Sequence, residues 1–159
     1  MKITDFLIIA LVLVLSILAQ QVPTQGCVTI ENRSVKRYLV SSTSYDADRR
    51  HVEYERAAEK WTITRAGTYY RITHARLGED LYESEYYWNG NYLFTWKPRT
   101  RITDGGAWWV ITPTDGGFFR IRNVKFGHCL YTNEMNSWIC AYEDCDSWRY
   151  EWKISSVGC

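Results

Sequence analysis

Aromatic side chains around a predicted turn are the residues whose types and spacing point most directly to chemistry. The segment Tyr86-Tyr87-Trp88-Asn89-Gly90-Asn91-Tyr92 places four aromatic rings around an Asn-Gly turn. Tyrosine and tryptophan on loops are common anchors of recognition surfaces, because each joins a large apolar face to a polar group. We therefore predict a recognition loop of Tyr86, Tyr87, Trp88 and Tyr92. The alternative is a loop that folds back over its own rings.

Catalytic and metal-binding patterns are missing from the sequence. The three histidines, His51, His74 and His128, are scattered and show no metal-ligand spacing. The sequence has no Gly-x-Ser-x-Gly nucleophile motif and no phosphate-binding glycine loop. We expect a binding protein with no enzymatic activity, no metal and no cofactor.

The composition indicates one globular domain with no nucleic-acid partner. The chain has 159 residues, of which 46% are hydrophobic and 23% charged, so it can bury a single core. Its formal net charge is +1, whereas a dedicated nucleic-acid binder carries a large basic surplus. The 8 tryptophans and 12 tyrosines exceed ordinary usage, and we expect them to be divided between the core and a binding surface.

The N-terminal residues have the pattern of a secretion signal. The apolar run from Phe6 to Ala19 is shorter than a membrane span requires. We therefore predict a signal peptide over residues 1–19, a secreted, extracellular domain over residues 20–159, and no membrane span. Secretion favours disulfide bonds among the five cysteines. The triplet Asn32-Arg33-Ser34 makes Asn32 a glycosylation acceptor.

An internal repeat predicts the elements that must position these residues. Three segments align without gaps, each with an apolar-x-Ile alternation and a leucine nine residues after the isoleucine. The repeated leucines are Leu39, Leu81 and Leu130, and a Trp-x-Ile motif follows each of them, at Trp61, Trp109 and Trp152. The leucine-to-tryptophan separations are 22, 28 and 22 residues, so the middle repeat carries about six extra residues, around 84–90 or 100–106.

The repeat predicts an all-β fold, because its period-2 alternation and its Asn-Gly and Asp-Gly-Gly turns are typical of strands. Three repeats of four short strands, closed by threefold pseudosymmetry, describe a β-trefoil with repeats of about 27–66, 67–115 and 116–159. The three repeated tryptophans should then lie in the core. The last strand should lie beside the first, so we predict a disulfide bond between Cys27 and Cys159.

The segment from Trp109 to Leu130 carries a family resemblance. Its order of Trp-Val-Ile, Gly117-Phe-Phe-Arg-Ile and Gly127-His-Cys-Leu resembles the ricin-type (B-chain-like) β-trefoil lectins, and the resemblance extends over residues 27–159. In length, leader and composition the chain also resembles the cysteine- and tryptophan-rich salivary proteins of Culex mosquitoes. That second resemblance implies a component of saliva that is delivered into a host.

The lectin resemblance implies shallow sugar pockets, each with an aromatic platform. The platform position falls on Glu55, Trp96 and Tyr142 in the three repeats, so it is aromatic in repeats two and three. The family's aspartate after the repeated leucine is replaced in every repeat, which argues against galactose binding in the ricin manner. Substitute polar groups stand near both platforms, and with them the expected ligand-binding set is Trp96, Tyr142, Glu83, Asn91, Asn133 and Asp144.

The lectin resemblance also implies a disulfide bond between Cys129 and Cys145, which would leave Cys140 as the free thiol. The competing arrangement pairs Cys140 with Cys145 and leaves Cys129 free and buried.

We predict a secreted, salivary, monomeric binding module whose partner is a glycan or glycoprotein of a host. The alternative is a protein-binding effector or protease inhibitor that acts through a protruding loop. The extra residues and aromatic tip of repeat two would supply such a loop. Sugar binding predicts paired sites in repeats two and three, whereas a protein binder predicts one dominant patch.

Overall fold

Twelve β-strands and one short 3-10 helix form the secondary structure of the described part of the chain. The computed structural model describes residues 20–87 and 90–159, so the expected signal peptide and Trp88 lie outside the described residues. The elements are β1 (Cys27–Asn32), β2 (Tyr38–Ser44), β3 (Arg49–Glu55), β4 (Trp61–Ala66), β5 (Tyr69–His74), β6 (Asp80–Tyr87), β7 (Asn91–Trp96), β8 (Trp109–Thr114), β9 (Phe118–Asn123), β10 (Cys129–Thr132), β11 (Ile139–Tyr142), η1 (Trp148–Tyr150) and β12 (Glu151–Val157). The prediction of an all-β chain is confirmed.

Each of the three aligned segments contains four strands: β1–β4, β5–β8 and β9–β12. The hairpins β2–β3, β6–β7 and β10–β11 pair in the same register. Their equivalent residue pairs are Tyr38 with Glu55, Asp80 with Trp96, and Cys129 with Tyr142. The three platform positions are therefore structurally equivalent.

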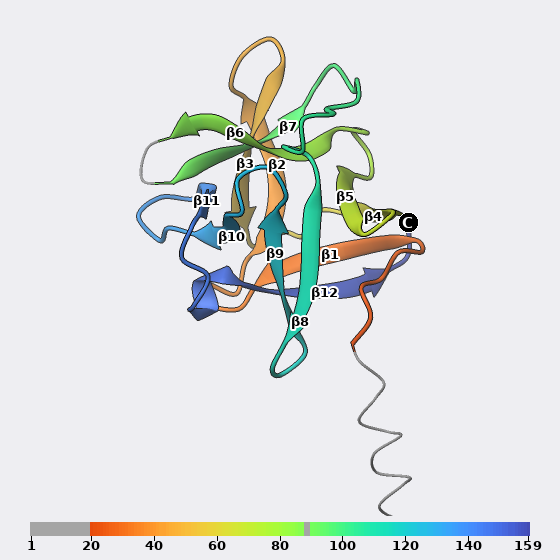
Figure 1. Cartoon of the computed structure of the whole chain (residues 1–159), viewed down its shortest axis with the longest axis vertical. Helices are drawn as coiled ribbons and strands as arrows, with labels where there is room; N and C mark the ends of the chain where they lie inside the picture. The colour runs from red at the N-terminus through yellow and green to blue at the C-terminus, as the bar shows by residue number, and fades with distance from the viewer. Residues whose placement is uncertain (1–19, 88–89) are drawn as a thin grey trace, which may run out of the picture.

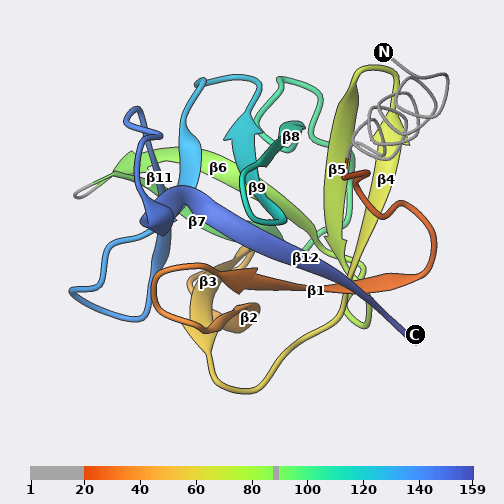
Figure 2. The ribbon, with the colours of Figure 1, turned by 90° about the horizontal axis from the view of Figure 1, so that it is seen from below.

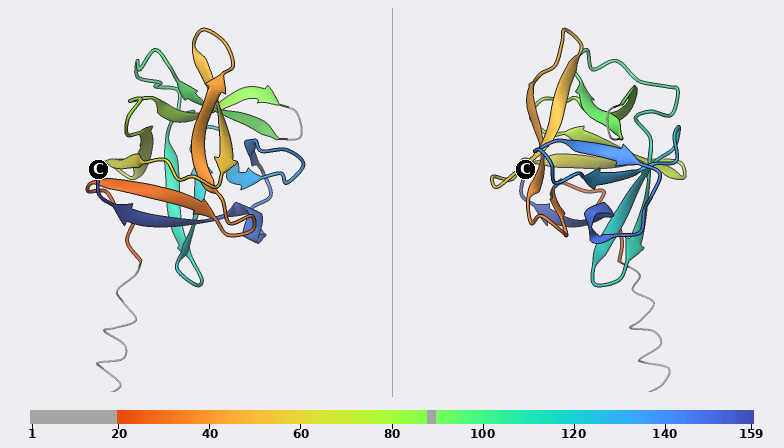
Figure 3. Two further views of the ribbon diagram at one scale, coloured as in Figure 1. Left: turned by 180° about the vertical axis from the view of Figure 1, so that it is seen from behind. Right: turned by 90° about the vertical axis from the view of Figure 1, so that its left-hand side faces the viewer.

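The strands pair in two sets. Six of them form a closed cycle, in which β1 pairs with β12, then β9, β8, β5 and β4 follow, and β4 pairs back with β1. The other six form the three hairpins, which pair with one another through β3–β7 and β7–β11. Figure 1 places β2–β3 and β6–β7 above β1 and β12. Figures 2 and 3 show β1 and β12 side by side, as their pairing requires.

The three repeated tryptophans are completely buried, and each makes the same kind of hydrogen bond. The indole Nε1 of each donates to the carbonyl of its repeat's leucine: Trp61 to Leu39 at 2.9 Å, Trp109 to Leu81 at 3.1 Å, and Trp152 to Leu130 at 2.9 Å. A buried indole N–H needs a partner, and the repeat supplies it at a constant place. The leucine-to-tryptophan spacing in the sequence thus corresponds to a physical contact.

The turn after the first strand of each repeat has a polar residue at its base, namely Asn32, His74 or Asn123. Each backbone N–H donates to the carbonyl five residues later, at 2.8, 2.9 and 2.8 Å. The side chains of Asn32 and Asn123 each accept two backbone N–H groups of the turn, and Nδ1 of His74 accepts that of Leu77. These residues hold turns, as side-chain acceptors commonly do.

The position of Asn32 in this turn argues against its use as a glycosylation acceptor. The Asn32 side chain is fully buried, and its Nδ2 donates to the carbonyl of Arg149 at 2.8 Å. Nδ2 is the atom to which a glycan would be attached, and the fold leaves no space around it. Three-residue acceptor motifs report only local sequence, whereas this burial depends on a carbonyl 117 residues away.

We predict that the secreted protein carries no glycan at Asn32. Treatment of the native and the denatured protein with peptide-N-glycosidase should leave the intact mass unchanged in both cases. A mass decrease after either treatment would contradict the buried position of Asn32. A positive control glycoprotein digested in the same reaction shows that the enzyme is active.

Two disulfide bonds join the chain. Cys27 is bonded to Cys159, with 5.1 Å between their Cα atoms, and Cys129 is bonded to Cys145, with 5.6 Å. Cys140 is a buried free thiol, and burial raises its pKa to about 12. The pairing of Cys140 with Cys145 is therefore not the one that forms. The high pKa keeps this thiol protonated and unreactive at neutral pH.

The extra residues of repeat two lie after its hairpin. The connection from β7 to β8 spans residues 97–108, whereas β3 and β4 are joined by residues 56–60. Of the two places considered in the sequence, the segment around residues 100–106 is the correct one. The aromatic turn between β6 and β7 therefore does not owe its position to an insertion.

Candidate ligand-binding site

A pocket of about 380 Å³ lies against the hairpin of repeat two. We call it the repeat-two pocket, and its lining residues are Asp46, Asp48, Arg49, Tyr82, Glu83, Ser84, Glu85, Tyr86, Trp96, Ile102, Asp104 and Lys125. Strands β6 and β7 and the connection 97–108 supply most of it. The β2–β3 turn and the β9–β10 turn complete it, so all three repeats contribute. Three of the predicted residues, Trp96, Glu83 and Tyr86, come together here.

Trp96 and Tyr82 form the aromatic part of the repeat-two pocket. Their rings meet edge to face, with centroids 5.7 Å apart and planes at 88°. The Trp96 indole N–H donates to the hydroxyl of Thr100 at 2.8 Å. Trp96 is the last residue of β7 and is half-buried. Its orientation is therefore fixed by Tyr82 on one strand and by Thr100 on the connection.

Arg49 brings repeat one to the same pocket. Its guanidinium lies over the Tyr86 ring at 4.4 Å and over the Tyr45 ring at 5.0 Å, which is the range of cation–π contacts. Its Nε donates to Asp46 at 2.7 Å. This hydrogen bond lowers the pKa of Asp46 and raises that of Arg49. The positive charge of Arg49 is therefore already balanced by the carboxylate of Asp46.

Lys125 brings repeat three to the pocket from the opposite side. Its Nζ donates to Asp104 at 2.8 Å and to Glu85 at 2.9 Å. The hydrogen bond from Lys125 lowers the pKa of Asp104, which also accepts the backbone N–H of Gly106 at 2.9 Å. Both basic residues of the pocket, Arg49 and Lys125, are therefore already ion-paired with carboxylates of the same pocket.

Glu83 and Asn91 do not form the open acceptor pair that we expected. The Glu83 side chain is fully buried, and its Oε1 accepts from Nδ2 of Asn91 at 2.8 Å and lies 2.7 Å from Nδ1 of His128. Burial raises the pKa of Glu83. Asn91 does not line the pocket. These side chains bind each other beneath the surface, because alternation along β6 turns Glu83 inward.

A second pocket, of about 420 Å³, lies against the hairpin of repeat three. This repeat-three pocket is lined by Tyr131, Asn133, Glu134, Met135, Tyr142, Arg149 and Tyr150. Tyr142 is 42% exposed, and Arg149 forms an ion pair with Glu134 at 3.0 Å. The predicted residues Tyr142 and Asn133 thus share a pocket. Asp144 lies outside it, exposed, and accepts the backbone N–H of Asp146.

The predicted recognition-loop residues that the structure describes lie in three different environments. Tyr86 lines the repeat-two pocket, and Tyr87 is 77% exposed without lining either pocket. Tyr92 contradicts the prediction, because its ring packs edge to face against Trp138, at 5.3 Å, and against Phe94. Tyr92 is therefore a packing residue, and the rings that it contacts lie outside the segment Tyr86–Tyr92.

Tyr92 belongs to an aromatic cluster where the three hairpins meet. His51 of β3 stacks on Trp138 with centroids 4.7 Å apart, and its ring meets Tyr45 edge to face at 4.9 Å. Burial lowers the pKa of His51 from its ordinary value of 6.5. The folded state therefore resists protonation of this ring more than the unfolded chain does.

We predict that stability falls as the pH decreases below about 6.5, because the unfolded chain then takes up a proton at His51 that the folded state does not. His51 contributes its full stabilisation above that pH. Thermal unfolding midpoints measured between about pH 7.5 and pH 5 should decrease less in a His51→Phe variant, which keeps an aromatic ring. Equal slopes in the two proteins would contradict this assignment.

Comparison with solved structures identifies the family. A salivary protein from Culex quinquefasciatus that belongs to the Cysteine and Tryptophan-Rich (CWRC) family is 50% identical, with a TM-score of 0.84 over 89% of this chain and 99% of that one. The chain belongs to the CWRC family. Comparison with family models and with curated proteins gives no match.

Two more distant structures share the fold of this CWRC chain. The designed threefold-symmetric protein ThreeFoil has a TM-score of 0.73 at 12% identity and covers 84% of this chain and 100% of its own. SeviL, solved with the asialo-GM1 saccharide bound, has a TM-score of 0.61 at 16% identity and covers 83% of this chain and 98% of its own. At such identities the likeness concerns the fold alone.

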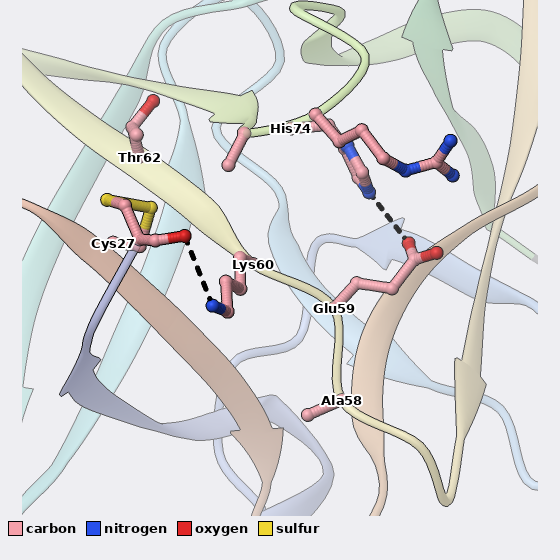
Figure 4. A pocket seen from close by; sticks show the side chains of 9 residues that line it. Cys27, Ala58, Glu59, Lys60, Thr62 and His74 are labelled. Atoms are coloured by element: carbon pink, nitrogen blue, oxygen red, sulfur yellow. Dashed lines mark hydrogen bonds and ion pairs between the residues drawn. A yellow bond between two sulfur atoms is a disulfide. The ribbon is translucent and has the colours of Figure 1, made fainter.

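A further pocket of the CWRC chain, which the sequence did not indicate, lies beside the Cys27–Cys159 disulfide bond (Figure 4). Its polar lining includes a pair of Glu59 and His74, with Oε2 of the glutamate and Nε2 of the histidine 2.9 Å apart. The other ring nitrogen of His74 accepts the N–H of Leu77. Both nitrogens therefore have structural partners, which does not favour a role as a catalytic base.

The described residues of the CWRC chain contain no cluster of three or more potential metal ligands. Within the same residues there is also no helix long and apolar enough to cross a membrane.

Proposed function

We propose that this CWRC protein is a secreted salivary β-trefoil that binds carbohydrate and acts as a monomer without enzymatic activity. The salivary relative and the predicted signal peptide support secretion. The β-trefoil assignment is supported by three sets of four strands, by the closed cycle of six strands and by the likeness to ThreeFoil.

The observation that carries the carbohydrate proposal is the composition of the repeat-two pocket. Trp96 offers aromatic surface for the C–H face of a sugar ring, the buried Tyr82 ring supports it edge to face, and carboxylates stand beside them. A sugar needs both features, because its ring stacks on apolar surface while its hydroxyl groups require acceptors and donors. SeviL, with the same fold, is known with a saccharide bound.

The charge of the repeat-two pocket restricts the glycan class. Four carboxylates, those of Asp46, Asp48, Glu85 and Asp104, face only two basic groups, and both basic groups are already paired. An anionic sugar would meet like charges and no uncommitted cation. The pocket therefore favours neutral glycans over sialylated or sulfated ones.

The test is a glycan array probed with the mature, disulfide-bonded protein and with three variants. Trp96→Ala should weaken binding in the repeat-two pocket about two- to tenfold, since aromatic stacking contributes about 0.5–1.5 kcal/mol. Trp96→Phe, the matched control, should retain part of it. Tyr142→Ala should remove the contribution of the repeat-three pocket. Neutral glycans should bind better than their sialylated forms.

An array on which the folded protein binds no glycan would end the carbohydrate proposal. Binding that survives a Trp96→Ala, Tyr142→Ala double variant would place the sugar elsewhere on the molecule.

The exposure of Tyr87 favours a second candidate, a protein-binding effector or inhibitor. Tyr87 is 77% exposed on the β6–β7 hairpin and lines neither pocket, which is the position of an anchor for a protein partner. A Tyr87→Ala variant should leave glycan binding unchanged. Loss of a host-protein interaction in that variant alone would favour this candidate over the carbohydrate proposal.

A further inference from the structure

A second aromatic pocket adjoins the repeat-two pocket. It has a volume of about 320 Å³ and is lined by Tyr69, Thr103, Asp104, Gly105, Trp108 and Val124. The rings of Trp108 and Tyr69 meet edge to face, with centroids 6.1 Å apart and planes at 88°. This arrangement of two rings beside a carboxylate repeats that of Trp96 and Tyr82 in the repeat-two pocket.

The two pockets share one ridge, formed by residues 102–106. Asp104 lines both pockets, and Ile102 lines the repeat-two pocket while its carbonyl accepts the indole N–H of Trp108 at 3.3 Å. The ridge packs closely against Lys125 at Gly105. The Gly105 backbone has a φ of +93°, and a Cβ atom added there would lie 3.3 Å from the Cβ atom of Lys125. Glycine is the residue that fits both conditions.

The ridge belongs to the extra residues of repeat two. The connection 97–108 supplies Trp108, Asp104 and Ile102, and the corresponding connection of repeat one, residues 56–60, is too short to build a second wall. The extra residues of this connection therefore place a second aromatic surface, at Trp108, next to the surface at Trp96.

We infer that the two pockets are adjoining subsites for one neutral oligosaccharide. One sugar stacks at Trp96, the neighbouring sugar stacks at Trp108, and Asp104 accepts hydroxyl hydrogen bonds on both sides of the ridge. This inference rests on the proposed function and extends it. It makes the length of the glycan a determinant of affinity, in addition to the identity of its terminal sugar.

The test measures binding against glycan length. Isothermal titration calorimetry uses neutral mono-, di- and trisaccharides that share a terminal sugar, chosen separately for galactose, N-acetylglucosamine and mannose. We expect the longer members of the bound series to bind about tenfold more tightly than the monosaccharide. Trp108→Ala and Tyr69→Ala should each remove most of this gain and leave monosaccharide affinity unchanged. Trp96→Ala should weaken every member.

Two controls keep the result interpretable. Tyr69 is 37% exposed, so Tyr69→Ala tests the pocket even if Trp108→Ala fails to fold. Tyr87→Ala removes an exposed tyrosine that lines neither pocket and should change nothing.

Three outcomes would overturn the inference. Equal affinity for mono- and trisaccharide would refute the second subsite while leaving the proposed function intact. A length gain that survives both Trp108→Ala and Tyr69→Ala would locate the second sugar elsewhere. Absence of binding to every series would refute the proposed function and this inference together.

Discussion

Replacing Trp109 with alanine is expected to destabilise the protein by about 3–5 kcal/mol, the usual cost of deleting a buried tryptophan side chain. Trp109 is completely buried at the start of β8, and its indole N–H donates to the carbonyl of Leu81 at 3.1 Å. The alanine variant loses the packing of the ring and leaves that buried carbonyl without its partner. Urea unfolding followed by circular dichroism measures the change.

Two further variants make the Trp109 result specific. Trp109→Phe keeps an aromatic ring but not the hydrogen bond, and should cost about 1–3 kcal/mol. Trp148→Ala removes a tryptophan that is 61% exposed and lies over the Arg33 guanidinium at 4.4 Å, so it should cost about 1 kcal/mol or less. Similar losses for Trp109→Ala and Trp148→Ala would show that the repeated tryptophan is not a core residue.

Removal of the Cys27–Cys159 bond is the second large expected effect. The bond joins residues 132 apart in sequence, whereas Cys129 and Cys145 are 16 apart. In the chain-entropy account, a bond that closes a longer loop restricts the unfolded chain more. A Cys27→Ser, Cys159→Ser variant should therefore lose about 4–5 kcal/mol, and a Cys129→Ser, Cys145→Ser variant about 3 kcal/mol.

The comparison of the two cysteine-pair variants is made by urea unfolding under non-reducing conditions. Cys140→Ala serves as control, since it removes a buried free thiol and leaves both bonds in place. A larger loss for the Cys129, Cys145 variant would contradict the loop-length explanation and would indicate that the shorter bond acts through native packing.

The strands and their repeat could be predicted from the sequence because their signals are local. Alternation, turn residues and a leucine-to-tryptophan spacing identify each strand set, and the spacing corresponds to one hydrogen bond, as between Trp61 and Leu39. The platform residues Trp96 and Tyr142 also follow from alignment, because their register relative to Asp80 and Cys129 is the same.

The composition of the site could not be predicted, because the repeat-two pocket is assembled from three repeats. Arg49, at the start of β3, and Lys125, on the β9–β10 connection, reach it from positions far away in sequence. The prediction that Glu83 contacts a ligand failed for a related reason. Its burial depends on His128, which is 45 residues away on the β9–β10 connection. Side-chain type identified the candidates, but only the folded chain determines which of them face a ligand.

The pairing of β1 with β12 has a consequence for the order of the repeats. These strands pair along the whole of β1, from Cys27 opposite Val157 to Asn32 opposite Trp152, in the same antiparallel manner as β4 with β5 and β8 with β9. The boundary between the last repeat and the first therefore resembles the two internal boundaries. A circular permutant that links residues 27 and 159 and opens the chain at Gly67 would keep every strand pair, and we expect it to reach the same fold.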